Sequence, residues 1–356
     1  MLLVTVFLVT RGHGISVSHG GKNSKTRENE KIATCGRFWY NAAEVRIMSN
    51  VTYLETGSTD PAYNLAFEEY VLTRRTQGDY LLLWQNDNTI VVGQNQNTAQ
   101  EIDPAFVKEH HITVVRRGTG GGAVYHDLGN LNYSFITDTG AAERLTMDRF
   151  TCPIVEALQN LGLNAEASGR NDILVEGRKV SGTAQRLVHG RILHHGTLLF
   201  DSRPEMIAGA LRVDQAKFTS KSAKSVKSRI GNIREFLPAD MTLPEFWEYL
   251  KRQLAGTGLV QSALTADELA QVSRLADEKY RTWEWTYGRS PKFDMVKRNY
   301  FTGGRLEVGV SVDHGSITEI RFYGDFLSLT DTTPLCRALE GVAYREDAVA
   351  AVLDSQ

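Results

Sequence analysis

Three consecutive glycines at positions 120–122 follow two arginines, Arg116 and Arg117, in the string RRGTGGGAVYHDLGN. Glycine in an ordered segment costs about 0.5–1 kcal/mol relative to alanine, so it is retained where φ is positive or where a ligand must touch the backbone. Cationic side chains and bare backbone amides that converge on one spot suit a phosphate or a carboxylate. The string therefore indicates an anion-binding loop, although three glycines alone are equally compatible with a glycine-rich hairpin.

This loop matches neither of the two common nucleotide-binding loops. No Gly-Lys-Ser or Gly-Lys-Thr follows the glycines, as a Walker loop requires. The glycines lead into Ala123, Val124 and Tyr125, and this apolar run does not begin a helix as the dinucleotide fingerprint requires. Both motifs are therefore excluded.

Lys179 is the second candidate for chemistry, in the string GRKVSGTA. The small residues Ser181 and Gly182 follow it and leave room for a bound molecule. An isolated lysine is most often an ordinary surface residue, so this position alone does not assign it a role.

Strands are predicted on both sides of these candidates. An apolar run at residues 112–115 enters the glycine loop, and the alternating residues Leu131, Tyr133 and Phe135 leave it, so the loop is expected to join two strands. The same patterns predict a three-strand meander at residues 172–175, 179–187 and 192–200. They also predict earlier strands at 51–56, 80–84 and 89–92, and a late hairpin of 305–312 with 316–323.

Helices are predicted where apolar residues recur at a spacing of three to four. Asp60 is an N-cap before Pro61, and Glu68 and Glu69 are expected on the solvated face of the helix that follows. The segment 147–161 is predicted to be mainly helical, with Pro153 marking where the regular helix starts. Further helices are expected after Asp103, from residue 265, and at 243–254, 334–339 and 345–353.

Composition is that of an ordinary globular protein. The 356 residues are enough for two domains, and 42% are hydrophobic and 23% charged. The net charge of −2 gives no indication of nucleic acid or an anionic membrane as partner. The cysteines Cys35, Cys152 and Cys336 are far apart, which argues against a zinc site or a disulfide scaffold and favours a reducing, cytoplasmic location.

The first 47 residues do not share this organisation. Their apolar start is too short to span a bilayer, and no basic stretch precedes it as in a signal peptide. A mitochondrial presequence is compatible with the mildly basic remainder, but Glu28, Glu30 and Glu44 are unusual in one. We expect residues 1–47 to be a disordered extension, with translation truly beginning at or near Met48.

The string RRGTGGGAVYHDLGN resembles the lipoate-binding loop of the lipoate–protein ligase A family, of the bacterial type with a C-terminal accessory domain, in the biotin/lipoate ligase superfamily. Five more strings resemble that family, and the last three do so in the same order and at similar spacing: DPAYNLAFEEYVL, GQNQN, SGRND, RKVSG and HHGTLL. The resemblance covers about residues 50–356. It implies an α+β fold, in which a mixed sheet flanked by helices forms a catalytic domain over residues 48–258 and a small α+β accessory domain follows over 259–356.

The resemblance also implies an activity. Such enzymes activate lipoate with ATP to lipoyl-AMP, with release of pyrophosphate, and then transfer lipoyl to a lysine of a carrier domain. The implied substrate is (R)-lipoate, the cofactors are ATP and Mg²⁺, and the partners are the lipoyl domains of 2-oxoacid dehydrogenase E2 subunits and the glycine cleavage H protein.

Site residues follow from the matching strings. Lys179 would bridge the α-phosphate and the acyl oxygen, while Asp172 is the candidate to place Mg²⁺, which binds hard oxygen ligands. Trp84 would line the pocket beside the acyl chain or the adenine. The remaining residues expected to bind ATP or lipoate are Arg117, Gly121, Gly122, Ala123, Val124, Tyr125, Asn171 and His195. A loop over residues 217–232 is expected to close over the adenylate, because Ser225–Arg229 matches the family's serine-valine-x-serine-arginine string.

Three other functions stay open. Octanoyl/lipoyl transferases of the same superfamily use a cysteine nucleophile, which requires a base beside the thiolate, and Cys152 has no histidine near it in sequence. A structural role is therefore favoured for Cys152. A module that holds lipoate or a lipoyl domain without turnover would not need Lys179. Biotin ligases have a different basic glycine string.

Overall fold

The computed structural model describes residues 51–139, 147–168, 171–211, 229–255, 258–288, 293–301, 303–328 and 331–355. The extension expected at residues 1–47, and residues 217–228 of the loop expected to close over the adenylate, lie outside these ranges. Within them, no helix has both the length and the apolar character needed to cross a bilayer.

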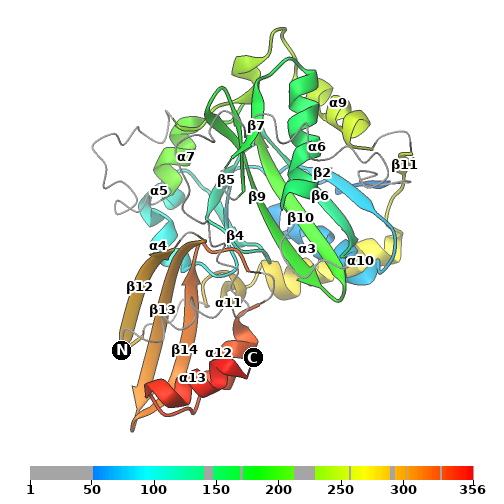
Figure 1. Cartoon of the computed structure of the whole chain (residues 1–356). Helices are drawn as coiled ribbons and strands as arrows, with labels where there is room; N and C mark the ends of the chain where they lie inside the picture. Colours follow the sequence, from blue (N-terminus) through cyan, green and yellow to red (C-terminus); the bar gives the residue numbers. More distant parts are fainter. Residues whose placement is uncertain are drawn as a thin grey trace, which may run out of the picture.

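An eight-stranded sheet forms the centre of the molecule (Figure 1). Its strands, in spatial order, are β11 (Val260–Gln261), β1 (Thr52–Glu55), β2 (Tyr80–Trp84), β6 (Asn130–Asp138), β10 (Arg191–Leu199), β9 (Arg178–Val188), β8 (Asp172–Val175) and β7 (Ala165–Ser168). Strand β1 runs parallel to both of its neighbours, whereas the pairs from β2 to β7 are antiparallel. The predicted mixed sheet and three-strand meander are therefore confirmed.

Helices cover both faces of this sheet. On one face, α6 (Met147–Asn160) and α9 (Leu243–Ala255) pack against inward residues such as Leu81 and Tyr133. On the other face, α3 (Pro61–Arg74) and α10 (Ala266–Leu275) pack against alternate residues such as Leu82. The two-residue period of the strands thus divides the core into two layers.

Helix α6 begins earlier than its proline suggests. It starts at Met147 and contains Pro153, so the expectation that the regular helix starts at Pro153 is wrong. Proline inside a helix removes one backbone hydrogen bond. The helix continues through this position because Phe150 and Ile154, on either side of it, are fully buried against the sheet.

A second sheet of three strands, in the order β4-β3-β5, lies beside the large one. It contains β3 (Thr89–Val92), β4 (Thr113–Arg116) and β5 (Val124–His126), and the glycine loop joins β4 to β5. The helices packed around it are α4 (Thr98–Glu101), α5 (Pro104–Glu109) and α7 (Pro204–Ala210). The glycine loop therefore joins two strands, but the second is the short strand β5, which was not predicted, and the strand expected there, β6, follows β5.

The C-terminal part has a hydrophobic core of its own. Its sheet, in the order β12-β13-β14, contains β12 (Met295–Phe301), β13 (Gly304–Asp313) and β14 (Ser316–Gly324). Helices α12 (Thr333–Leu339) and α13 (Glu346–Asp354) cover one face of it (Figure 1). The remaining short helical elements are η2 (Ile233–Phe236), η3 (Ala276–Tyr280) and α11 (Trp283–Thr286).

The predicted domain boundary after residue 258 stays a prediction. Val272 of α10 and both Ala276 and Tyr280 of η3 belong to the core that α3 forms with the large sheet. A division at residue 258 would place α10 and η3 in the C-terminal unit, although their buried residues pack in the core of the catalytic unit.

Candidate active site

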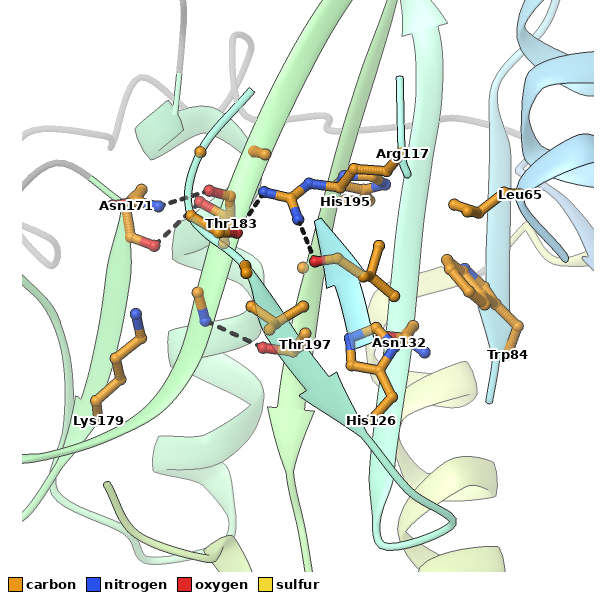
Figure 2. Close-up of a pocket in the computed structure, with 18 residues that line it drawn as sticks. Leu65, Trp84, Arg117, His126, Asn132, Asn171, Lys179, Thr183, His195 and Thr197 are labelled. Atoms are coloured by element: carbon orange, nitrogen blue, oxygen red, sulfur yellow. Dashed lines mark hydrogen bonds between the residues drawn. The ribbon is translucent and has the colours of Figure 1, made fainter. Parts of the chain in front are cut away.

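A pocket lies between the large sheet, α3 and the glycine loop (Figure 2). Its floor follows one row of residues across five strands. Trp84 pairs with Asn132, Asn132 pairs with Thr197, and Asp172 pairs with Gly182. The Gly182 amide donates a hydrogen bond to Thr197 Oγ1 (3.2 Å), which closes the row. Four steps of about 4.8 Å between strands make the floor roughly 19 Å long.

The two ends of this floor differ. Trp84 is 3% exposed and lies with Leu65 and Val91 at a buried, apolar end. Lys179 lines the open end, and Asp172, which is not among the lining residues, pairs with it there; their side chains are 38% and 35% exposed. Figure 2 shows Lys179 on one side of the pocket and Trp84 with Leu65 on the other. A long ligand can therefore have its apolar part buried and its charged part at the mouth.

A bulge directs Lys179 toward this pocket. Ile173 pairs with Ser181 but Leu174 pairs with Lys179, so Val180 is an extra residue in β9. Val180 packs in the core on the far face of the sheet, and Lys179 is turned to the pocket face. Its Nζ lies 2.7 Å from Asp172 Oδ1, and a Cβ added to Gly182 would lie 3.1 Å from that Nζ. Glycine at 182 therefore leaves room for the ammonium group.

Arg117 braces the glycine loop. It was expected to hold a phosphate, but its guanidinium donates to the carbonyls of Gly120 (2.7 Å), Gly122 (2.8 Å) and Val91 (3.1 Å). Burial lowers the pKa of Arg117 to about 10, so it remains a cation at neutral pH. Its contribution in this structure is to fix the loop, because a buried guanidinium requires acceptors and the nearest ones are loop carbonyls.

Arg116 is fully buried outside the pocket. It donates to the carbonyls of Gly93, Gln94 and Gln96 and to those of Trp285 and Thr286. The two arginines therefore do not converge on one spot, contrary to the expectation from their spacing, because Arg117 lines the pocket and Arg116 lies outside it.

The glycines themselves lie where expected. Gly121 has a φ of +90°, a conformation that favours glycine, and both Gly121 and Gly122 line the pocket. Ala123 and Val124 continue this wall. The loop thus presents backbone to the pocket, as an anion-binding loop requires.

Tyr125 does not continue the wall, contrary to the expectation. It packs in the core of the small sheet, and its hydroxyl donates to Asn88 Oδ1 (2.9 Å). Successive side chains of a strand face opposite ways, so Val124 and His126 line the pocket and Tyr125 faces away. The sequence did not lead us to expect His126 in the pocket. Its position two residues after Val124, on the same face of the strand, could have identified it.

Glu68 is not solvated, contrary to the expectation, since it is 4% exposed. Its Oε1 lies 2.9 Å from His195 Nδ1 and accepts a hydrogen bond from Ser134 Oγ (2.6 Å). Ser134 in turn accepts from Trp84 Nε1 (2.9 Å), and His195 Nε2 lies 2.8 Å from Thr119 Oγ1. A buried chain of hydrogen bonds thus links the indole at the apolar end to the glycine loop. His195 lines the pocket, as predicted.

Glu69 is also mostly buried, with 15% of its side chain exposed. Lys279 Nζ lies 2.6 Å from its Oε2, and the Tyr280 hydroxyl donates to the same oxygen. Burial alone would raise the pKa of Glu69, but Lys279 and Tyr280 hold it below its ordinary value. Sequence periodicity placed Glu69 on the outer face because η3, which supplies Lys279 and Tyr280, comes about 200 residues later in the chain.

Asn171 lies in the pocket as predicted, whereas Cys152 does not line it. Asn171 lines the pocket, and its Nδ2 donates to the carbonyl of Thr183 (2.7 Å). Cys152 is half-buried, forms no disulfide among the described residues and lies on α6, which covers the opposite face of the sheet, and it is absent from the lining of this pocket. In the part of the chain that the structure describes, no three His, Cys, Asp or Glu side chains gather as a metal cluster.

Comparison with known proteins identifies relatives along most of the chain. The model of the lipoyl protein ligase A/B catalytic domain matches residues 60–255, and that of the bacterial lipoate protein ligase C-terminus matches residues 290–356. The chain is 42% identical over 300 residues to lipoate-protein ligase LplJ of Bacillus subtilis, covering 83% of this chain and 91% of the relative.

Solved structures share the fold. LipL1 of P. falciparum superposes with a TM-score of 0.73 at 23% identity, over 86% of this chain and 95% of the other. A lipoate-protein ligase A bound with ATP gives a TM-score of 0.58 at 27% identity, over 68% of this chain and 99% of the other.

Proposed function

The chain belongs to the lipoyl protein ligase A/B family, and on this premise we propose that it uses ATP to convert lipoate into lipoyl-AMP and pyrophosphate, then transfers lipoyl to a lysine of a carrier domain. The observation that carries the proposal is the floor of the pocket, which has the Lys179 ammonium at its open end and the Trp84 indole at its buried end.

The chemistry requires a cation where Lys179 lies. A carboxylic acid is a poor acyl donor because hydroxide is a poor leaving group, whereas a mixed anhydride with AMP can be attacked by an amine. Forming that anhydride loads negative charge on the α-phosphate oxygens. Lys179, Gly121 and Gly122 line the same pocket. The Lys179 ammonium and the Gly122 amide would stabilise this charge from fixed positions, whereas the Gly121 amide donates to the Phe326 carbonyl (3.3 Å) in this structure.

The apolar end has the character that an acyl chain requires. Leu65, Trp84 and Val91 offer hydrophobic surface there. With the chain buried at that end, the carboxylate extends along the floor toward Lys179. The ATP-bound structure of a lipoate-protein ligase A supports placing a nucleotide in this fold.

Asp172 fits one part of a magnesium site. Mg²⁺ in nucleotide enzymes is usually held by one or two carboxylates together with substrate phosphates. The Asp172 carboxylate is partly exposed at the pocket mouth, beside the place proposed for the phosphates. When bound there, Mg²⁺ would neutralise charge on the triphosphate.

The proposed acceptors are the lipoyl domains of 2-oxoacid dehydrogenase E2 subunits and the glycine cleavage H protein. Support for a protein acceptor comes from the similarity to a lipoate-protein ligase over 91% of that relative's length. The acceptor lysine would reach the mixed anhydride at the open end, where Lys179 and Asp172 are accessible.

The second candidate is an octanoyl/lipoyl transferase that works through a cysteine thioester. It would require a thiolate beside Lys179, but Cys152 lies on α6 and does not line the pocket. A binding module without turnover would have no use for the Lys179–Asp172 pair at the mouth.

One incubation separates these candidates. The full chain is mixed with ATP, lipoate and a purified lipoyl domain, and pyrophosphate and the intact mass of the lipoyl domain are measured. The proposal expects lipoylation of the domain with stoichiometric pyrophosphate, and neither product when ATP is omitted. Modification from a carrier thioester without ATP would identify a transferase, and no modification from either donor would identify a binding module.

A further inference from the structure

The buried end of the pocket contains polar groups that the proposed chemistry does not use. His126 and Asn132 are 3% and 2% exposed, and both line the pocket beside Trp84. Figure 2 shows both of them nearer to Trp84 than to Lys179. Among the described residues, neither His126 Nε2 nor Asn132 Nδ2 has a hydrogen-bond partner.

The hydrogen-bond network determines which nitrogen of His126 is protonated. Asn64 Nδ2 contacts the carbonyls of Ser58 (3.1 Å) and Gln85 (2.7 Å), which can only accept, so this atom is the amide nitrogen. It also donates to Asn86 Oδ1 (3.0 Å), so Asn86 offers its Nδ2 to His126 Nδ1 (3.1 Å). Nδ1 of His126 is therefore an acceptor.

His126 is a neutral imidazole at physiological pH. Burial, together with the charge of Arg117, lowers the pKa of His126 to about 3. A neutral imidazole carries one proton, and Nδ1 does not have it. The proton therefore lies on Nε2, which gives the pocket an N–H donor without a partner in the described structure.

Asn132 supplies a second polar group, its side-chain amide. Its Oδ1 accepts a hydrogen bond from Asn130 Nδ2 (3.1 Å), and its own Nδ2 has no partner within the part of the chain described. Asn132 is the neighbour of Trp84 in the row that forms the pocket floor. One imidazole N–H and one side-chain amide thus lie at an end that is otherwise apolar, with Leu65, Trp84 and Val91 around them.

A hydrocarbon chain is a poor match for this end. A buried donor that loses water and gains no acceptor lowers the affinity for the ligand that displaced the water. A ligand with acceptor atoms near its far end avoids this loss, and sulfur is a weak acceptor that is also compatible with apolar walls. The dithiolane of lipoate has two such atoms where octanoate has only carbon.

We propose that His126 and Asn132 determine substrate specificity and favour lipoate over octanoate: His126 donates its Nε2–H to a dithiolane sulfur, and the Asn132 amide places a second buried polar group at the same end. This inference rests on the proposed function, because it takes the buried end as the place of the acyl terminus. It extends that function by assigning the choice between the two acids to two residues.

The test compares the two acids in variants of the full chain. His126→Phe and Asn132→Leu, called the donor variants below, each remove a buried hydrogen-bonding group, and Leu65→Ile changes the apolar wall at the same end without changing a hydrogen-bonding atom. Pyrophosphate release with ATP is measured at several concentrations of lipoate and of octanoate. The ratio of kcat/KM for lipoate to that for octanoate should fall about tenfold in each donor variant and stay within about twofold in Leu65→Ile.

A second measurement uses only the wild-type chain, so it does not depend on whether a variant folds. An acid of octanoate's length with one thioether sulfur replacing a CH₂ near its end should be used better than octanoate. Equal use of these two acids, or an unchanged ratio in both donor variants, overturns the inference and leaves the proposed function in place. Absence of pyrophosphate with every acid contradicts the proposed function, and this inference with it.

Discussion

Lys179 is the residue on which the account depends most. A bulge turns it from the core face of β9 to the pocket, and Asp172 holds its ammonium at 2.7 Å. Both half-reactions develop charge on the same phosphate and acyl oxygens, so one ammonium can act in both.

Lys179→Ala should therefore reduce both half-reactions. We expect a loss of about 10²–10³ in rate, the scale for removing one preorganised donor, and little change in melting temperature because the Lys179–Asp172 pair is partly exposed. Lys179→Arg should not restore activity, since a planar guanidinium does not replace a compact ammonium. Near-normal pyrophosphate release by the alanine variant would return Lys179 to an ordinary strand lysine.

Two buried histidines should make the fold sensitive to acid. Burial lowers the pKa of His126 and of His194 to about 3. Each is neutral when folded but takes up a proton in the unfolded chain below about pH 6.5, so its contribution to stability is present above that pH and is lost as the pH falls toward 3. Together they should lower the free energy of unfolding by up to about 2.7 kcal/mol per pH unit in that window.

Urea unfolding at pH 7, 6 and 5 measures this dependence, and His194→Phe should make it shallower. A variant that loses stability with acid as steeply as the wild type would show that His194 is not buried as a neutral side chain.

At the scale of secondary structure, the sequence predicts elements better than it predicts what covers them. Two-residue and three-to-four-residue periods located α3 and six of the eight strands of the large sheet, because these periods follow directly from backbone geometry. The edge strands β7 and β11 were not predicted. Glu68 was misplaced because its partner His195 lies 127 residues away. Tyr125 was misplaced because the matching string was taken as continuous, whereas a strand alternates its faces.

The contact of α3 with η3 should depend on one carboxylate. Glu69→Gln removes the charge that pairs with Lys279, while leaving an oxygen for the Tyr280 hydroxyl. We expect the free energy of unfolding to fall by about 1–3 kcal/mol, measured by urea denaturation at neutral pH. Glu156→Gln, on the exposed face of α6, is the matched control and should leave stability within about 0.5 kcal/mol. Equal stability of the two variants would show that the buried pair contributes no more than a surface carboxylate.

At the scale of the whole molecule, the C-terminal unit contacts the loops that form the pocket. The Gly324 amide donates to the Asn95 carbonyl (2.8 Å), and the Gly121 amide donates to the Phe326 carbonyl (3.3 Å). Arg305 of β13 pairs with Glu101 of α4, and their side chains are 9% and 12% exposed. The orientation of the C-terminal unit and the conformation of the glycine loop are therefore coupled.

Glu101→Gln should weaken this coupling. Hydrogen exchange should become faster at the amides of Gly121 and Gly324, while amides inside the C-terminal sheet keep their protection because that core remains intact. Glu346→Gln, an exposed change on α13, serves as the control. Unchanged exchange at Gly121 and Gly324 would show that the ion pair does not hold the two units together.

The central claim is that activation and transfer are separate steps at one pocket, and a single-turnover experiment without any carrier domain tests it most directly. The full chain is mixed with ATP and lipoate, and the bound products are measured by mass spectrometry alongside pyrophosphate. The account predicts about one lipoyl-AMP per chain and an equal amount of pyrophosphate. A protein that forms neither product until a carrier is added, or that acquires a covalent acyl group at a cysteine, would contradict it.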